Sequence, residues 1–190
     1  MNYSELCELY QELERNPSRL KKTEILSEFL EKIKHEKDKS IVYTLKGRIF
    51  PDYDERETGI STQLVMKALS KVSGIPETEI ITEWNQIGDL GKVAEKVAGN
   101  KKQASLFMKK LTVEKVIENL RKLPALEGKG TVDKKIGLIV ELLNSASPVE
   151  AKYITRLLLS DLRIGIGEGV LRDSIVWACL EKENKEDYIL

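Results

Sequence analysis

One loop of this sequence combines an arginine with closely spaced glycines, and this combination suits phosphate binding. It reads Arg163-Ile164-Gly165-Ile166-Gly167-Glu168-Gly169 and leads into a helical pattern. Glycine lets the backbone approach a ligand closely, and the N–H groups at a helix start favour a phosphate oxygen. We therefore predict phosphate contacts at Arg163, Gly165, Gly167, Glu168 and Gly169. The alternative at each position is an ordinary loop or helix cap.

A similar loop occurs earlier in the chain. Arg48-Ile49 is followed by a nine-residue insert, 50–58, and then by Gly59-Ile60-Ser61-Thr62-Gln63. The counterparts of the first loop are therefore Arg48, Thr62 and Gln63. The segments ahead of the two loops also resemble each other, since Lys22–Leu30 matches Lys135–Leu143 about 110 residues later.

The unit of helix, helix, arginine loop and helix is thus predicted twice, in halves of about 20–75 and 131–182. A duplication that presents two similar loops suits a ligand with two similar sides. Duplex DNA, with its two phosphate strands, is the commonest such ligand. Chance similarity between amphipathic helices is the alternative interpretation.

Two further groups of polar residues accompany these loops. Gly128-Lys129-Gly130 precedes Thr131, which we expect to cap a helix, so Gly128, Lys129, Gly130 and Thr131 form a third candidate phosphate loop. Ser147-Pro148-Val149-Glu150 is a strong helix start signal. On that helix Lys152, Thr155 and Arg156 are predicted to share a polar face beside the second arginine loop.

The elements that must position these loops are predicted to be helices throughout. Apolar residues recur at helical spacing in most segments, for example Leu6, Leu9, Tyr10 and Leu13, or Ile25, Leu26, Phe29, Leu30 and Ile33. The last helix is expected over about 168–181, with Val170, Leu171, Ile175 and either Trp177 or Ala178 inward. No stretch alternates as a strand would. The fold class is therefore all-α, in one compact domain or two pseudo-equivalent lobes with an internal pseudo-two-fold repeat.

Composition excludes several functions. Lys and Arg balance Asp and Glu at 31 each, which argues against indiscriminate nucleic-acid binding, although residues 92–115 are rich in lysine. We expect both cysteines, Cys7 and Cys179, to be buried free thiols, and we expect no metal site.

The single histidine, His35, is expected to face solvent. No catalytic constellation or phosphate-binding Walker loop is present, and Asp52–Glu57 is interpreted as a solvated acidic insert. Without a membrane span or signal peptide, a cytoplasmic protein is expected.

Several motifs together resemble a known family. In chain order they are Leu45–Pro51, Gly59-Ile60, Gly88–Glu95, Gly128–Gly130 and Leu162–Ile166. This series is similar to the N-terminal DNA-binding domain of archaeal ATP-dependent DNA ligases. The resemblance covers nearly the whole chain, and the order and spacing of the motifs make it specific.

The resemblance implies a helical, monomeric domain that binds the minor-groove side of nicked double-stranded DNA and contacts phosphates on both sides of the nick. In the family it assists an adenylation domain and an OB-fold domain in DNA replication, repair and recombination. The family's Lys-x-Asp-Gly motif, whose lysine takes up AMP, is absent from this sequence. We therefore expect a chain that is inactive alone, with no cofactor of its own, while ATP and Mg²⁺ belong to the parent ligase.

The segment Gln103-Ala104-Ser105-Leu106-Phe107 resembles the shortened motif by which archaeal ligases bind the sliding clamp, PCNA. Gln103, Leu106 and Phe107 would be the anchors, although Leu106 stands where an aromatic residue is typical. The alternative is that Leu106 and Phe107 are core residues. A second interpretation of the entire chain also stays open, namely a helical protein-interaction module whose contact with DNA is incidental.

Overall fold

The computed structural model of the protein describes residues 1–35, 39–100 and 110–179. Within these ranges the chain forms ten helices and no strand, apart from one isolated bridge between Asn2 and Thr112, so the all-α prediction is confirmed. The helices are α1 (Tyr3–Arg15), α2 (Arg19–Ile33), α3 (Ser40–Leu45), α4 (Thr62–Ser73), α5 (Glu77–Ile87), α6 (Leu90–Gly99), α7 (Val113–Lys122), α8 (Thr131–Ser145), α9 (Pro148–Leu158) and α10 (Glu168–Cys179).

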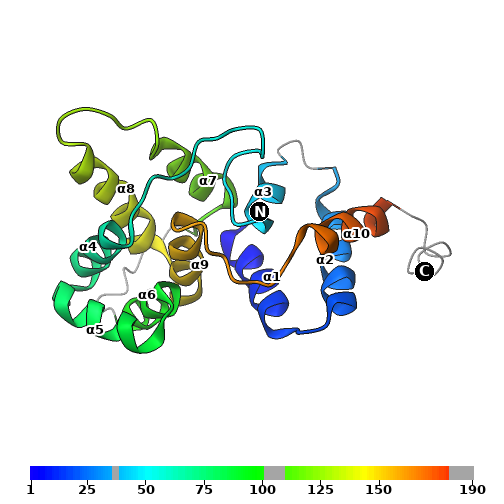
Figure 1. The fold of residues 1–190 in the computed structure, drawn as a ribbon, viewed down its shortest axis with the longest axis horizontal. Coiled ribbons are helices and arrows are strands. Elements are labelled where there is room, and N and C mark those ends of the chain that lie inside the picture. Colours follow the sequence, from blue (N-terminus) through cyan, green and yellow to red (C-terminus); the bar gives the residue numbers. More distant parts are fainter. Residues whose placement is uncertain (36–38, 101–109, 180–190) are drawn as a thin grey trace. The chain divides into compact units, whose positions relative to one another are not determined.

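The chain divides into two compact units, each assembled from segments far apart in sequence. The first, unit 1, contains Met1–Cys7 and Ser40–Leu162, and the second, unit 2, contains Glu8–Lys39 and Arg163–Leu190. Within unit 1, α6 packs on α9 and α4 packs on α8; within unit 2, α2 packs on α10, as Figure 1 shows. Helix α1 begins in unit 1 and continues into unit 2.

Helix boundaries follow local sequence signals. The hydroxyl of Ser147 accepts a hydrogen bond from the backbone N–H of Glu150, whose carboxylate accepts one from the N–H of Ser147, so the predicted capping box of α9 is confirmed. The hydroxyl of Ser61 caps α4 in the same way, by accepting from the N–H of Leu64. Gly74, with a φ of 74°, ends that helix in the left-handed conformation.

The core consists of the predicted apolar stripes. Leu6, Leu9, Tyr10 and Leu13 of α1 are all buried, as are most members of the α2 stripe. In α10, however, the prediction for Ile175 is wrong, since its side chain is 43% exposed, and Ser174 is buried in its place. The Ser174 hydroxyl donates to the carbonyl of Val170, 2.7 Å away, within its own helix. This bond satisfies the buried hydroxyl, so a polar residue can occupy the inner face.

The two cysteines differ in exposure. Cys7 is buried, as expected, but Cys179 is exposed, so the prediction of two buried thiols is wrong for the second.

The predicted order of elements occurs twice. One copy consists of α2, α3, the loop that contains Arg48, and α4. The other consists of α8, α9, the loop that contains Arg163, and α10. The packing joins the copies crosswise. The first helix of one copy, α2, packs on the last helix of the other, α10, and α8 packs on α4. The pseudo-two-fold relation between the copies stays a prediction.

Candidate nucleic-acid interface

The first arginine loop, in unit 1, leaves α3 through a tight turn. Gly47 has a φ of 71°, and a Cβ atom there would lie 3.4 Å from the Cβ of Leu162. Arg48 follows, with its side chain 36% exposed. Its guanidinium donates to the carbonyl of Asp54 at 3.1 Å and lies 3.3 Å from the carboxylate of Asp52. The turn therefore places a half-exposed cation next to an acidic segment of the same loop.

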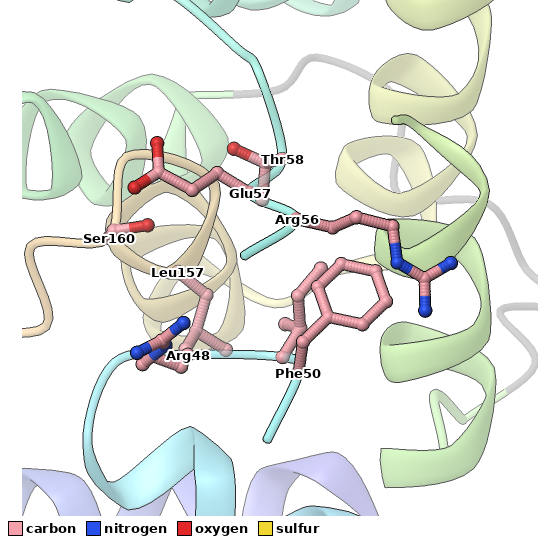
Figure 2. Close-up of a pocket in the computed structure, with 8 residues that line it drawn as sticks. Arg48, Phe50, Arg56, Glu57, Thr58, Leu157 and Ser160 are labelled. Carbon is pink, nitrogen blue, oxygen red and sulfur yellow. The ribbon is translucent and has the colours of Figure 1, made fainter. Parts of the chain in front are cut away.

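A pocket of about 190 Å³ opens beside Arg48. It is lined by Arg48, Ile49, Phe50, Arg56, Glu57, Thr58, Leu157 and Ser160. Figure 2 shows the guanidinium groups of Arg48 and Arg56 at opposite sides of the pocket, with Phe50 between them. The Arg56 guanidinium lies 4.5 Å from the centre of the Phe50 ring, a distance at which a cation and a ring attract each other.

The loop beside this pocket is anchored rather than loose. The hydroxyl of Thr58 donates to the carbonyl of Leu158 at 2.6 Å, in the last turn of α9, and both groups are buried. On the other side Arg121 donates to the carbonyl of Ile49 at 2.8 Å. These two bonds fix both ends of the insert that separates Arg48 from Gly59.

Two carboxylates of the insert, those of Asp52 and Asp54, are paired with cations that lie in the insert or just before it. The hydrogen bond from Lys46 lowers the pKa of Asp52, with a smaller contribution from the charge of Arg48. Hydrogen bonds from Arg56 lower the pKa of Asp54 to about 2. Both carboxylates are therefore ionised at neutral pH and partly neutralise the cations around the pocket. The insert is exposed at most positions, in agreement with the prediction of a solvated acidic loop.

The loop continues past Gly59, whose φ is 61°, to the start of α4. Thr62 is half-buried and Gln63 is exposed there. A Cβ atom on Gly59 would lie 3.7 Å from the ammonium nitrogen of Lys135, in α8. The segment that enters α4 therefore lies against the first turns of α8.

The third predicted loop, residues 128–131, is exposed ahead of α8 and also belongs to unit 1. Gly128 and Gly130 have φ values of 85° and 80°, and Lys129 is exposed between them. The prediction that Thr131 caps α8 is wrong. Thr131 is the first helical residue, and its hydroxyl donates to the carbonyl of Gly128 instead of accepting from a helical N–H. Gly130 occupies the cap position and supplies no side chain, so side-chain capping is absent from this helix start.

The second arginine loop, in unit 2, contains two residues in the left-handed conformation. Arg163 has a φ of 57° and Gly165 one of 65°, and both are exposed. For a residue with a side chain this conformation costs about 1–2 kcal/mol, so something must hold Arg163 in it. The adjacent backbone is held by Lys22 of α2, whose ammonium donates to the carbonyl of Ile164 at 2.7 Å and to that of Gly165 at 3.0 Å.

The end of the second loop lies at the start of α10. Gly167 and Glu168 are exposed and Gly169 is half-buried. A Cβ atom on Gly169 would lie 3.2 Å from the guanidinium of Arg19, which pairs with Asp173 at 2.7 Å. A second arginine of unit 2 thus lies close to the glycines of this loop.

The predicted polar face of α9 is wrong. Thr155 is fully buried, and Lys152 and Arg156 are 7% and 2% exposed. The guanidinium of Arg156 lies 2.6 Å from the carboxylate of Asp89 and donates to the carbonyl of Leu162 at 3.2 Å. This buried ion pair explains why an arginine occupies the interior, since a paired charge can be buried where an isolated one cannot.

Asp89 also caps α6, because its carboxylate accepts from the N–H groups of Gly91 and Lys92. A Cβ atom on Gly91 would lie 2.7 Å from the side chain of Arg156, so only glycine permits this close approach of α6 to α9. The guanidinium of Arg156 is therefore engaged inside the protein, and Lys152 and Thr155 are buried on the same helix.

The predicted residues separate as follows. Arg48, Thr62, Gln63 and Gly128–Thr131 lie at the surface of unit 1, and Arg163, Gly165, Gly167, Glu168 and Gly169 lie in the loop of unit 2. The predicted clamp-binding residues Gln103, Leu106 and Phe107 lie outside the described residues. Sequence reasoning missed Lys22 and Lys135, although they are the first residues of the two segments whose similarity led to the prediction of a repeat.

Comparison with known proteins decides the family. Residues 2–176 match the family described as DNA ligase N terminus. The chain belongs to this DNA ligase family. Its resemblance to archaeal ligases is confirmed by relatives named DNA ligase. The protein of Methanosphaera stadtmanae is 44% identical over 181 residues, which cover 93% of this chain and 32% of the relative.

Two other archaeal relatives agree. The DNA ligase of Archaeoglobus fulgidus is 40% identical over 94% of this chain and 32% of its own length. That of Methanocaldococcus jannaschii is 36% identical over 98% of this chain and 33% of its own length. This ligase segment therefore spans about a third of the length of the relatives it matches. No helix in its described part is long and apolar enough to cross a bilayer.

Proposed function

We propose that this ligase N-terminal segment binds nicked duplex DNA through phosphate and minor-groove contacts and positions it for sealing by the catalytic domains of a ligase. The observation that carries the proposal is an exposed arginine loop with a left-handed glycine in each unit, Arg48 to Gly59 and Arg163 to Gly165, in a chain of the ligase family. Two equivalent loops suit the two phosphate strands of a duplex.

The proposed contacts are made to the DNA backbone. Arginine side chains, backbone N–H groups of the glycine loops and the start of α8, which has no side-chain cap, all suit phosphate oxygens and read no base. Such contacts fix the position of a duplex without selecting its sequence. A nick interrupts base stacking, so the duplex is easier to deform there, and a domain that widens the minor groove would gain from that.

The rest of the reaction belongs to other parts of the enzyme in this proposal. The Lys-x-Asp-Gly motif is absent here, so adenylation with ATP and Mg²⁺ would take place in the catalytic domain of the parent protein. The domain would act in DNA replication, repair and recombination, as a monomer in the archaeal cytoplasm. Gln103, Leu106 and Phe107 are proposed, from sequence alone, to bind the sliding clamp.

A salt titration of DNA binding tests the proposal. The observed affinity of a protein that displaces counterions from phosphates falls linearly on a log–log salt plot, with a slope of about −0.9 per phosphate contacted. We expect the 190-residue chain to bind labelled nicked duplex more tightly than intact duplex or single strand, with such a slope. Replacement Arg163→Ala should make the slope shallower by about one unit for all duplex sequences equally.

The matched control is Arg15→Ala, which removes the same charge at the end of α1, far in sequence from either loop. It should leave the slope unchanged. An absence of duplex binding by the unmodified chain at low salt would refute the proposal and favour the protein-interaction module. A loss on Arg163→Ala that depends on DNA sequence would refute the backbone-contact role of this arginine.

A further inference from the structure

A lysine lies over the left-handed glycine of each arginine loop, and in both cases it comes from the other copy of the repeat. In unit 2 a Cβ atom on Gly165 would collide with the ammonium nitrogen of Lys22. In unit 1 the ammonium nitrogen of Lys135 would lie 3.7 Å from a Cβ atom on Gly59. Both glycines have positive φ values, 65° and 61°.

The two lysine–glycine pairs occupy corresponding positions in the repeat. Sequence similarity aligns Lys22–Leu30 with Lys135–Leu143, and it aligns Gly165 with Gly59. The fold brings each lysine to the glycine of the opposite copy, through the packing of α2 on α10 and of α8 on α4. A lysine close to the left-handed glycine therefore recurs in both compact units, and in unit 2 the lysine also donates hydrogen bonds to the loop.

The contacts around Lys22 give the stronger evidence for an anion site. It is only 8% exposed, and its ammonium donates to two consecutive loop carbonyls, those of Ile164 and Gly165. An ammonium group has three hydrogens, and the third has no acceptor among the residues that the structure describes. No carboxylate in those residues forms an ion pair with Lys22, so its positive charge lies buried beside neutral carbonyls. A buried cation without a counter-ion favours a nearby anion.

The position of Lys22 suits an anion bound by the loop itself. Arg163 and Gly165 are exposed, and Lys22 approaches Gly165 from the side where any other residue would have a side chain. The absence of a side chain at Gly165 leaves the ammonium close to the exposed backbone of the loop. Lys135 lies on the corresponding side of Gly59, 3.7 Å from the position of a Cβ atom, and is half-exposed.

We infer that Lys22 and Lys135 are equivalent phosphate-binding residues, each of which completes an anion site with the glycine loop contributed by the other copy. The ligand of each site is a backbone phosphate of duplex DNA. This inference rests on the proposed function. It adds Lys22 and Lys135, which lie outside the arginine loops, to the residues proposed to contact DNA. It also explains the glycine at 165, because a larger residue there would displace the ammonium.

The test replaces each lysine with methionine, which keeps much of the length of the side chain and removes the charge. Lys135→Met and Lys22→Met should each make the salt slope of duplex binding shallower by about 0.9, and the double variant by about 1.8. The matched controls are Lys134→Met and Lys21→Met, because these exposed neighbours carry the same charge on the same helices. The controls should keep the slope of the unmodified chain.

Thermal unfolding of every variant accompanies the titration. If Lys22→Met lowers affinity without changing the slope, Lys22 only shapes the loop, and the inference is wrong for it. If Lys22→Met does not fold, Lys22→Arg, which keeps the charge, should fold and retain the slope, and Lys135→Met decides the phosphate role. Slopes unchanged in both methionine variants, while the unmodified chain binds duplex, would overturn the inference and leave the proposed function intact. No duplex binding by the unmodified chain would instead refute the proposed function.

Discussion

The buried ion pair between Arg156 and Asp89 supports a prediction about both stability and DNA binding. The two side chains are 3% and 7% exposed, and their closest atoms are 2.6 Å apart. Replacement of Arg156 with methionine keeps much of its apolar volume but removes the guanidinium that pairs with the buried carboxylate of Asp89. Removal of one partner from a buried pair costs about 3–5 kcal/mol.

Hydrogen bonds to Asp89 place the expected loss at the lower end of this range. Asp89 would keep two hydrogen bonds from the backbone, from Gly91 at 2.9 Å and Lys92 at 3.3 Å. We therefore expect Arg156→Met to lower the free energy of unfolding by about 3 kcal/mol, which corresponds to about 6–12 °C in Tm for a chain of this size. Calorimetry and urea unfolding measure both quantities. The control Arg172→Met removes an arginine whose side chain is 70% exposed and paired with Asp173, and it should cost less than about 1 kcal/mol.

The same variant separates an interior arginine from one that contacts DNA. Below its melting temperature, Arg156→Met should bind duplex with the salt slope of the unmodified chain, since a guanidinium already paired with the carboxylate of Asp89 displaces no counterion from DNA. A slope shallower by about one unit would show that Arg156 reaches a phosphate and would refute its placement inside the protein. A loss of stability below about 1 kcal/mol would refute the energetic argument.

The exposed loops lead to three more predictions. Replacement Asp52→Asn removes a carboxylate that competes with phosphate for Lys46 and Arg48, so it should tighten duplex binding at low salt, as measured by fluorescence anisotropy; unchanged or weaker binding would contradict this. Asp54 should titrate near pH 2 in an NMR experiment, and Arg56→Ala should return it to about 4. Because folding depresses this pKa, the stabilisation is present above about pH 4 and is lost as the pH falls toward 2, and an equal acid sensitivity in Arg56→Ala would argue against the pair. Phe107→Ala should abolish binding to the sliding clamp in surface plasmon resonance while duplex binding persists, whereas an unfolded product would favour a core role.

Local signals in the sequence are enough to predict most of the fold. Helical periodicity identifies the buried stripes of α1 and α2, and the Ser147 capping box identifies the start of α9. These signals succeed because the residues involved lie within one or two turns of each other. The similarity between the two arginine loops is also visible in the sequence, and Arg163 and Gly165 are exposed in the structure.

The wrong predictions share one physical origin, which is that side-chain type does not reveal which group in the folded chain satisfies a polar side chain. The charge of Arg156 predicts a polar surface, but Asp89, 67 residues earlier, pairs with it in the interior. Ser174 is buried in place of Ile175, because its hydroxyl is satisfied by the carbonyl one turn earlier. Thr131 donates to Gly128, and Gly130, in the left-handed conformation, occupies the cap position.

The sequence by itself determined the helical class and the family and led to the prediction of a repeat, since these depend on periodicity, spacing and the order of motifs. Only the tertiary structure decided which charges lie at the surface and which pair in the interior. It also decided that Lys22 and Lys135 meet the glycines of the opposite copy. The physical reason is that both outcomes depend on contacts between residues far apart in the chain, and such contacts arise only when α2 packs on α10 and α8 on α4.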